Sequence, residues 1–200
     1  MSGRAVCAHC ARPLVTCICG WVRPIHGKVE VLILQHPLEV GQAKGSARLL
    51  HLCLAGSRLV TGETFDEATL AALLFAPMDG RAASPLLLYP ATPGACMATT
   101  AAAPAATRLV VLDATWRKSR KMLMANPLLQ SLPRLALADL PPSRYRIRKA
   151  HAPHQLSTLE ASAYALMQLD GEATPYGGLI AAFDDFVAQQ MALAAGGAMV

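Results

Sequence analysis

One stretch of the sequence constrains the fold more than any other: the apolar run Leu109–Leu112, which ends at Asp113 and continues into a cationic segment. Because the run is apolar on both faces, it predicts a strand buried inside a parallel sheet. Thr115 suits the N-cap of a helix that begins at Trp116. Ligands of open α/β sheets bind beyond the carboxyl ends of the strands, so Asp113 is expected at a ligand-binding edge.

The helix predicted after Asp113 is basic on one side. Helical periodicity places four cations on one broad arc of the helix, and Trp116 and Leu123 lie outside that arc. These cations are Arg117, Lys118, Arg120 and Lys121. The region from Arg117 to His154 holds nine of the 18 cations but only one of the 13 acids, in a chain of formal net charge +5. Such a region is expected for binding a phosphate backbone, and a solvated basic surface is the alternative.

Composition bounds the class of protein. Two hundred residues, 54% of them hydrophobic, are enough for one folded domain with a sizeable core and a small appendage. No apolar run approaches the roughly 18 residues of a membrane helix, and the N-terminus lacks the apolar segment of a signal peptide. We therefore predict a soluble cytoplasmic protein with no membrane association and no obligate protein partner.

Four cysteines near the N-terminus form a C-x2-C-x6-C-x-C array: Cys7, Cys10, Cys17 and Cys19. Four thiolates this close can complete a tetrahedral zinc site. Disulfides are the alternative, and the cytosolic compartment expected from the missing signal peptide argues against them. Four sulfurs leave no open position on the metal, so the array predicts structural Zn²⁺. Cys53 and Cys96 have no partner by spacing, and Cys53 is predicted to be a buried thiol.

The remaining elements alternate in type. Apolar runs predict strands at 29–35, 57–61, 85–90 and 134–138. Helical patterns cover 48–54, 66–75, 157–169 and 179–191, the last with Met191 on its apolar face. This alternation indicates an α/β fold. Residues 91–107 are mostly Ala, Thr and Pro, which predicts a flexible loop.

Two loop segments carry further binding candidates. The loop after the first predicted strand holds Lys44, with Arg48 close behind, and it could bind a ligand or merely connect two elements. In Ser143–Lys149 an extended backbone would place Arg144, Arg146 and Arg148 on one face, which suits phosphate contacts. The alternative is a basic edge strand that discourages aggregation.

Ser157 and Glu160 have the spacing of a capping box, which explains both residues structurally. The helix N-terminus that they mark also offers N–H groups to a carboxylate or phosphate. The sequence has no G-x-x-x-x-G-K-[ST] and no G-x-G-x-x-G, so binding of nucleoside triphosphates or dinucleotides is disfavoured. Nor does it show a serine elbow or a cysteine–histidine arrangement typical of nucleophilic enzymes.

Taken together, these motifs resemble the DTW-domain family. Asp113-Ala114-Thr115-Trp116 resembles the D-x-T-W signature of that family. Its other landmarks are matched in the same order by the cysteine array, His36-Pro37-x-Glu39, Tyr145–Lys149 and Ser157–Ala161. The resemblance extends from Cys7 to about Gly178. One departure is the segment 43–48, Ala-Lys-Gly-Ser-Ala-Arg, where relatives often have Asn-Thr-Gly-Arg.

The resemblance implies a tRNA-uridine aminocarboxypropyltransferase. Such enzymes move the 3-amino-3-carboxypropyl group of S-adenosyl-L-methionine to N3 of a uridine, in bacterial relatives in the tRNA variable loop, and form acp3U and 5′-methylthioadenosine. It also implies a SPOUT-like, mostly parallel sheet flanked by helices, with a trefoil knot in the C-terminal half. The expected divisions are a zinc-binding element with four cysteines at 1–24, the catalytic domain at 25–195 and a flexible tail at 196–200.

The resemblance further assigns roles to residues. Asp113 is the catalytic candidate, because it could accept the imide proton of the uridine or orient the base while water does so. The cofactor is expected among Leu88, Tyr89, Pro90, Asp113, Ala114, Thr115, Trp116, Ser157, Thr158 and Leu159. The amides of 157–159 would receive its carboxylate, and Trp116 would stack on a base or on adenine, or else pack in the core.

The cations would hold the tRNA backbone. They are Lys44, Arg48, Arg117, Lys118, Arg120, Lys121, Arg144, Arg146, Arg148 and Lys149. Two alternatives remain: a SPOUT-type RNA methyltransferase that uses the same cofactor, and a non-catalytic zinc-containing RNA-binding module.

Overall fold

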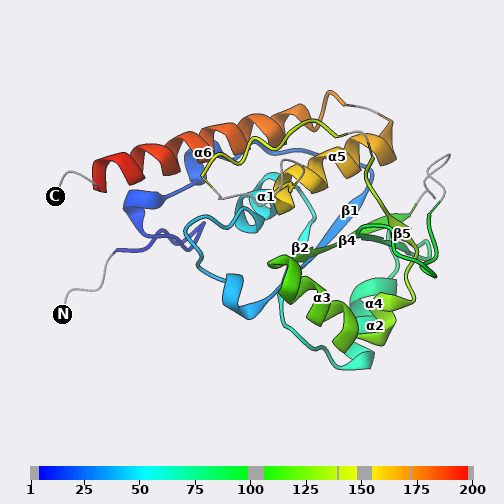
Figure 1. Cartoon of the computed structure of the whole chain (residues 1–200). Helices are drawn as coiled ribbons and strands as arrows, with labels where there is room; N and C mark the ends of the chain where they lie inside the picture. Colours follow the sequence, from blue (N-terminus) through cyan, green and yellow to red (C-terminus); the bar gives the residue numbers. More distant parts are fainter. Residues whose placement is uncertain (1–4, 99–105, 139, 148–154, 172, 198–200) are drawn as a thin grey trace.

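A five-stranded parallel sheet forms the centre of the protein, in the order β2-β1-β4-β3-β5 (Figure 1). The structure is a computed structural model that describes residues 5–98, 106–138, 140–147, 155–171 and 173–197. The strands are β1 (Glu30–Gln35), β2 (Arg58–Thr61), β3 (Ser84–Leu88), β4 (Thr107–Asp113) and β5 (Arg134–Leu135). An α/β fold with a parallel sheet is thereby confirmed, and β4 is the buried strand that its apolar run predicts.

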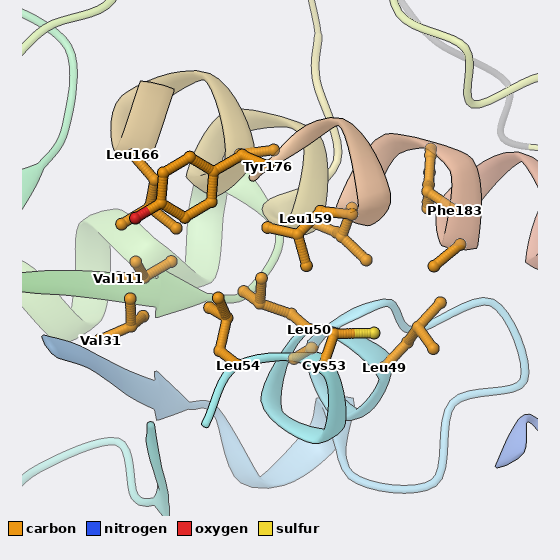
Figure 2. Close-up of a cluster of buried hydrophobic side chains, with 14 of the residues drawn as sticks. Val31, Leu49, Leu50, Cys53, Leu54, Val111, Leu159, Leu166, Tyr176 and Phe183 are labelled. Carbon is orange, nitrogen blue, oxygen red and sulfur yellow. The ribbon is translucent and has the colours of Figure 1, made fainter. Parts of the chain in front are cut away.

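Helices cover both faces of the sheet, because alternate side chains of the central strands point to opposite sides. On one face Val31 and Val111 pack against α1 (Ala47–Cys53), α5 (Thr158–Asp170) and α6 (Gly177–Gly197). Figure 2 shows this cluster, with side chains of all three helices meeting those of the strands. On the other face Leu32 and Val110 pack against α2 (Glu67–Phe75), α3 (Trp116–Ala125) and α4 (Pro127–Gln130).

The carboxyl ends of β1 and β4 are level with each other. Gln35, the last residue of β1, is in register with Asp113, the last residue of β4. The next amide, His36 N–H, donates to the Asp113 carbonyl at 3.0 Å. The chain then enters a short 3₁₀ helix, η3 (Pro37–Glu39). Two more 3₁₀ helices, η1 (Leu14–Thr16) and η2 (Cys19–Trp21), lie in the cysteine-rich segment.

Helix termini follow the sequence signals closely. The Asp66 side chain caps α2 by accepting from Thr69 N–H at 3.0 Å. Ser157 and Glu160 form the predicted capping box at the start of α5. Gly171 ends α5 in the left-handed region at φ 68°, a conformation that glycine adopts without steric cost.

Three predictions about local structure need correction. The last strand, β5, is two residues long and does not extend to residue 138. Ser143–Ile147 is not an extended strand, because Arg146 N–H donates to the Arg144 carbonyl at 2.8 Å and turns the backbone. Met191 is exposed, since the last turns of α6 project beyond the core. Among the described residues no helix is long and apolar enough to cross a membrane.

A buried ion pair joins the sheet to α2. Arg108 is 1% exposed, and its guanidinium donates to both carboxylate oxygens of Glu30, at 2.9 and 3.0 Å. It also donates to the carbonyls of Leu73 and Leu74 at the end of α2. The pair and its added hydrogen bonds satisfy a charge that the core would otherwise exclude.

Removing one partner should therefore be costly. Glu30→Ala leaves the Arg108 charge buried without its carboxylate, and we expect a loss of about 3–5 kcal/mol in the free energy of unfolding. Urea denaturation measures this loss. The matched control is Glu67→Ala in the exposed first turn of α2, with an expected loss below about 1 kcal/mol. Equal losses in the two variants would contradict the role of the pair.

Candidate active site and metal centre

Two neighbouring cavities at the carboxyl edge of the sheet share part of their lining. The larger has a volume of about 520 Å³ and the smaller about 180 Å³. Both are lined by Ala114, which follows β4, and by Ser157 and Thr158 at the start of α5. These three residues therefore form a wall that the two cavities share. Asp113 lines the smaller cavity, beside this wall.

The larger cavity is mainly apolar. Its lining includes Leu88–Ala91 from the end of β3 onward, Leu135–Ala138 from the end of β5 onward, and Trp116. Trp116 is 51% exposed and meets Tyr89 edge to face, with ring centroids 6.3 Å apart. Core packing of Trp116 is therefore wrong, and its indole is available to a ligand in the cavity. The volume lies within the ~300–1,000 Å³ common for small-molecule sites.

The residues that the resemblance assigns to the cofactor are divided between the two cavities. Leu88, Tyr89, Pro90, Ala114, Trp116, Ser157 and Thr158 line the larger one. Asp113 and Thr115 line only the smaller one, and Leu159 is buried in the core and lines neither. The segment 135–138 was missed as a lining segment, because its place depends on β5 pairing with β3.

The Asp113 carboxylate is held on both oxygens. Its Oδ1 accepts from the Thr158 hydroxyl at 2.7 Å, and its Oδ2 accepts from the Gln35 amide at 2.9 Å. Asp113 itself is 6% exposed. Because the two donors come from different elements, β1 and α5, they fix the orientation of the carboxylate. Gln35 was missed by the sequence reasoning, although a polar residue ending an apolar strand was a usable signal.

Charged groups surround the smaller cavity. Glu39 lines it and forms an ion pair with Lys118 of α3, Nζ to Oε1 at 2.8 Å. Lys44 lines it too, and its ammonium donates to the Ile147 carbonyl at 2.8 Å. The Tyr145 hydroxyl donates to the carbonyl of Lys44. The segment 143–147 and the loop that contains Lys44 are thus fastened to each other across the cavity.

The N-terminus of α5 is already occupied by internal hydrogen bonds. Glu160 is fully buried, and its carboxylate accepts from the amides of Ser157 at 2.8 Å and Arg144 at 2.6 Å. The Leu159 amide donates to the Ser46 hydroxyl at 3.4 Å. Two of the three amides predicted to receive a cofactor carboxylate are therefore engaged within the protein.

The predicted RNA-binding cations have different surroundings. Arg117, Arg120 and Arg146 are exposed. Lys121 and Arg144 are exposed and pair with Glu63 and Asp184, each at 2.5 Å. Hydrogen bonds from Lys121 and His36 lower the pKa of Glu63. Arg148 and Lys149 lie outside the described residues. Arg117 and Arg120 are sequence neighbours of Trp116 and Ser119, which line the larger cavity.

The four cysteine sulfurs converge as predicted. The sulfurs of Cys7, Cys10, Cys17 and Cys19 lie within 4.8 Å of one another. The Cys7–Cys19 and Cys10–Cys17 distances are 3.6 and 3.7 Å. A tetrahedral Zn²⁺ with Zn–S distances of ~2.3 Å separates its sulfurs by about 3.8 Å. The donor set and its spacing therefore fit a structural zinc ion.

The thiols of this cluster differ in acidity. Hydrogen bonds from the backbone of Cys10 and His9 lower the pKa of the Cys7 thiol to about 6. Burial, with hydrogen bonds to the other thiols, raises the pKa of Cys19 to about 12. The backbone hydrogen bonds favour the thiolate form of Cys7, which is the form that binds a cation. Cys53 is a buried thiol, as predicted, and burial raises its pKa.

Comparison with known proteins gives a consistent result. The sequence model of the DTW domain matches residues 4–191. A relative in Drosophila melanogaster, tRNA-uridine aminocarboxypropyltransferase 2, is 30% identical over 175 residues, which is 84% of this chain and 67% of that protein. Proteins of the same name in Macaca fascicularis and Mus musculus are 27% and 28% identical over 84% of this chain. No solved structure matches significantly.

The chain spans about 57% of the length of the macaque and mouse relatives. All three relatives have the name of a transferase, and the prediction of an enzyme of this class agrees with them. The predicted family is confirmed by the match over residues 4–191 and by the fly relative. The chain belongs to the DTW domain family.

Proposed function

We propose that this chain transfers the 3-amino-3-carboxypropyl group of S-adenosyl-L-methionine to N3 of a uridine in tRNA, in the variable loop, forming acp3U and 5′-methylthioadenosine. The relatives' names support the reaction class. The observation that carries the proposal is the position of Asp113. It lies, with both carboxylate oxygens held, in a small cavity that shares a wall with a larger one.

The two cavities suit the two substrates. The larger, apolar cavity offers Trp116 and Tyr89 to an adenine ring, and its volume matches a ligand of this size. The smaller cavity, lined by Asp113 and Lys44, suits a polar pyrimidine base. Their shared wall, which includes Ala114 and Thr158, is where the reacting atoms would meet. Holding both substrates across this short distance is itself a large contribution to the rate.

The reaction releases the imide proton of the uridine, and Asp113 is placed to act on it. When bound, S-adenosyl-L-methionine supplies the transferred group on a carbon activated by its sulfonium. Uridine N3 carries an imide proton that must leave for the nitrogen to attack. Asp113 accepts this proton, or it orients the base while water accepts the proton. The hydrogen bonds from Gln35 and Thr158 keep its carboxylate aimed at the cavity.

The exposed cations are proposed to bind the tRNA backbone. Arg117 and Arg120 follow Trp116 on α3, and Arg146 lies one residue beyond Tyr145 of the smaller cavity. Phosphate contacts of this kind fix the register of an RNA and carry no base information. The uridine would then be selected by the smaller cavity.

We further propose the divisions 1–24, 25–195 and 196–200, with structural Zn²⁺ in the first. Ile25 supports the boundary, because its amide donates to the Cys53 carbonyl at 2.7 Å and its carbonyl accepts from Ala55 N–H at 3.1 Å. Ile25 is therefore hydrogen-bonded to the end of α1 and to the residue pair that follows it, which belong to the proposed second division. A SPOUT relationship with a knot in the C-terminal half stays a prediction.

Labelled S-adenosyl-L-methionine tests the reaction. With the isotope in the carboxyl group, purified protein should label tRNA, and mass spectrometry should find acp3U among its nucleosides. Label that enters only from the methyl group would establish the rival methyltransferase. Binding of tRNA without transfer of either label would instead support a non-catalytic module.

Trp116→Ala tests the assignment of the larger cavity. Loss of a stacked ring costs about 1–3 kcal/mol for a nucleic-acid base, so we expect the KM for S-adenosyl-L-methionine to rise roughly tenfold or more. The KM for tRNA should change less. The control is Met124→Ala, on the same helix and 65% exposed, which should leave both constants unchanged. Unchanged cofactor KM in Trp116→Ala would remove the indole from the cofactor site.

A further inference from the structure

The Arg12 side chain joins the cysteine cluster to another part of the protein. It follows Cys10 by two residues, and its carbonyl accepts from the Cys7 amide at 2.8 Å, so its backbone belongs to the metal-binding turn. The residue is 9% exposed. Its guanidinium lies over the Phe186 ring of α6, 5.1 Å from the centroid, which is a favourable cation–π position.

The same guanidinium holds the loop 42–46 by its carbonyl groups. It donates to Ala43 at 2.8 Å and to Gly45 at 2.7 Å, with a longer contact to Gln42 at 3.5 Å. Hydrogen bonds from a charged donor are stronger than those from a neutral one. Just beyond the loop, Arg48 donates to the His9 carbonyl of the cysteine turn at 2.6 Å. The cysteine turn is therefore bonded both to the loop itself and to the first turn of the helix that follows it.

The loop 42–46 is also a wall of the cavity that contains Asp113. Gln42, Lys44, Gly45 and Ser46 all line that cavity. The Lys44 carbonyl accepts from the Tyr145 hydroxyl, and the Ser46 hydroxyl accepts from the Leu159 amide at 3.4 Å. A shift of this loop would therefore move the surfaces that face the proposed uridine.

We propose that Arg12 is a positioning residue for the transfer reaction, through which the metal-bound cysteine turn sets the shape of the uridine cavity. The role of Arg12 in transfer and the assignment of the cavity to uridine rest on the proposed function. The cysteine cluster stabilises its own turn. It also positions the Arg12 guanidinium against the carbonyl groups of the loop 42–46. Loss of metal then weakens RNA substrate binding at a distance from the metal itself.

Hydrogen exchange of the loop amides tests the link directly. The Gly45 amide, which donates to the Gln42 carbonyl at 2.9 Å, reports whether the turn is intact. Arg12→Ala should speed its exchange about tenfold or more, because two charge-assisted hydrogen bonds are lost. Arg12→Lys retains a cation that can reach one carbonyl, so its exchange should be intermediate, and it serves if Arg12→Ala does not fold. Both variants should retain zinc, measured by mass spectrometry of the metal.

The matched control is Gln189→Ala. The Gln189 amide donates to the Cys17 carbonyl at 2.9 Å, so this variant loosens the cluster's contact with α6 without touching the loop 42–46.

Chelation of the metal should speed loop exchange in the wild type and add little in Arg12→Ala, since both act through one connection. In steady-state transfer, Arg12→Ala should raise the KM for tRNA more than it raises the KM for S-adenosyl-L-methionine, and Arg12→Lys should recover part of this loss.

Three outcomes would overturn the proposal: loop exchange that Arg12→Ala leaves unchanged, equal effects of Arg12→Ala and Gln189→Ala, or loss of zinc from Arg12→Ala. Exchange and metal content need no catalytic activity. A protein that forms no acp3U but shows the expected exchange pattern would therefore refute the proposed function and keep the structural connection.

Discussion

Asp113→Asn is expected to lower the rate of aminocarboxypropyl transfer by about 10²–10⁴-fold, the usual contribution of a positioned acid–base group. The asparagine side chain has the same shape but cannot take a proton. Its oxygen can accept from the Gln35 amide, and its amide group can face the Thr158 hydroxyl, which donates in the wild type but can rotate to accept. The substitution therefore removes the charge and the proton acceptor while leaving partners for both terminal atoms of the side chain.

Single-turnover transfer from labelled S-adenosyl-L-methionine is the measurement, with tRNA affinity measured in parallel. Affinity should change little, because the proposed backbone contacts come from other residues. Asp79→Asn is the control: it makes the same chemical change at an exposed turn residue with φ 48°, which asparagine tolerates. A rate for Asp113→Asn within twofold of wild type would exclude Asp113 from the reaction.

Cys10→Ser is expected to abolish stoichiometric zinc binding and to lower the melting temperature. Cys10 is the most buried ligand of the cluster, so a water molecule cannot readily replace its sulfur on the metal. Structural zinc contributes folding free energy directly, and a loss of about 4 kcal/mol corresponds to a drop of roughly 8–16 °C for a chain of this size.

Metal analysis of the purified variant and a thermal melt with and without added zinc are the measurements. Cys96→Ser is the control, because Cys96 is exposed and outside the cluster. It should retain the metal and the melting temperature of the wild type. If Cys10→Ser binds one zinc per chain and melts with the wild type, the cysteine turn is not a structural zinc site.

Local sequence patterns predicted the structure correctly where neighbouring residues determine the backbone conformation. The apolar run of β4, the start of α3 at Trp116 and the capping box of Ser157 all follow from neighbouring residues. The four cysteines converge because they are close in sequence. In these cases the interactions that fix the structure span few residues, so sequence spacing contains the information.

Interactions between distant segments were not predictable in the same way. Gln35 holds Asp113 only because β1 and β4 are neighbours in register, and strand order is not visible in a local pattern. In Ser143–Ile147 the backbone turns where an extended strand was predicted, and Glu160 of α5 holds Arg144 N–H there. For Trp116 the sequence allowed either stacking on a ligand or packing in the core, because local pattern does not show whether the indole is exposed.

The contact between the cysteine turn and α6 has a consequence for biosynthesis. The Cys17 carbonyl and the Gln189 amide that donates to it are 172 residues apart, and the Phe186 ring under Arg12 is nearly as distant. A ribosome releases the cysteines early and these α6 residues much later. A nascent chain can thus gather its zinc ligands long before Arg12 gains its last support. Bound zinc on a growing chain would therefore mark the first step of maturation, and the docking of α6 would mark the last.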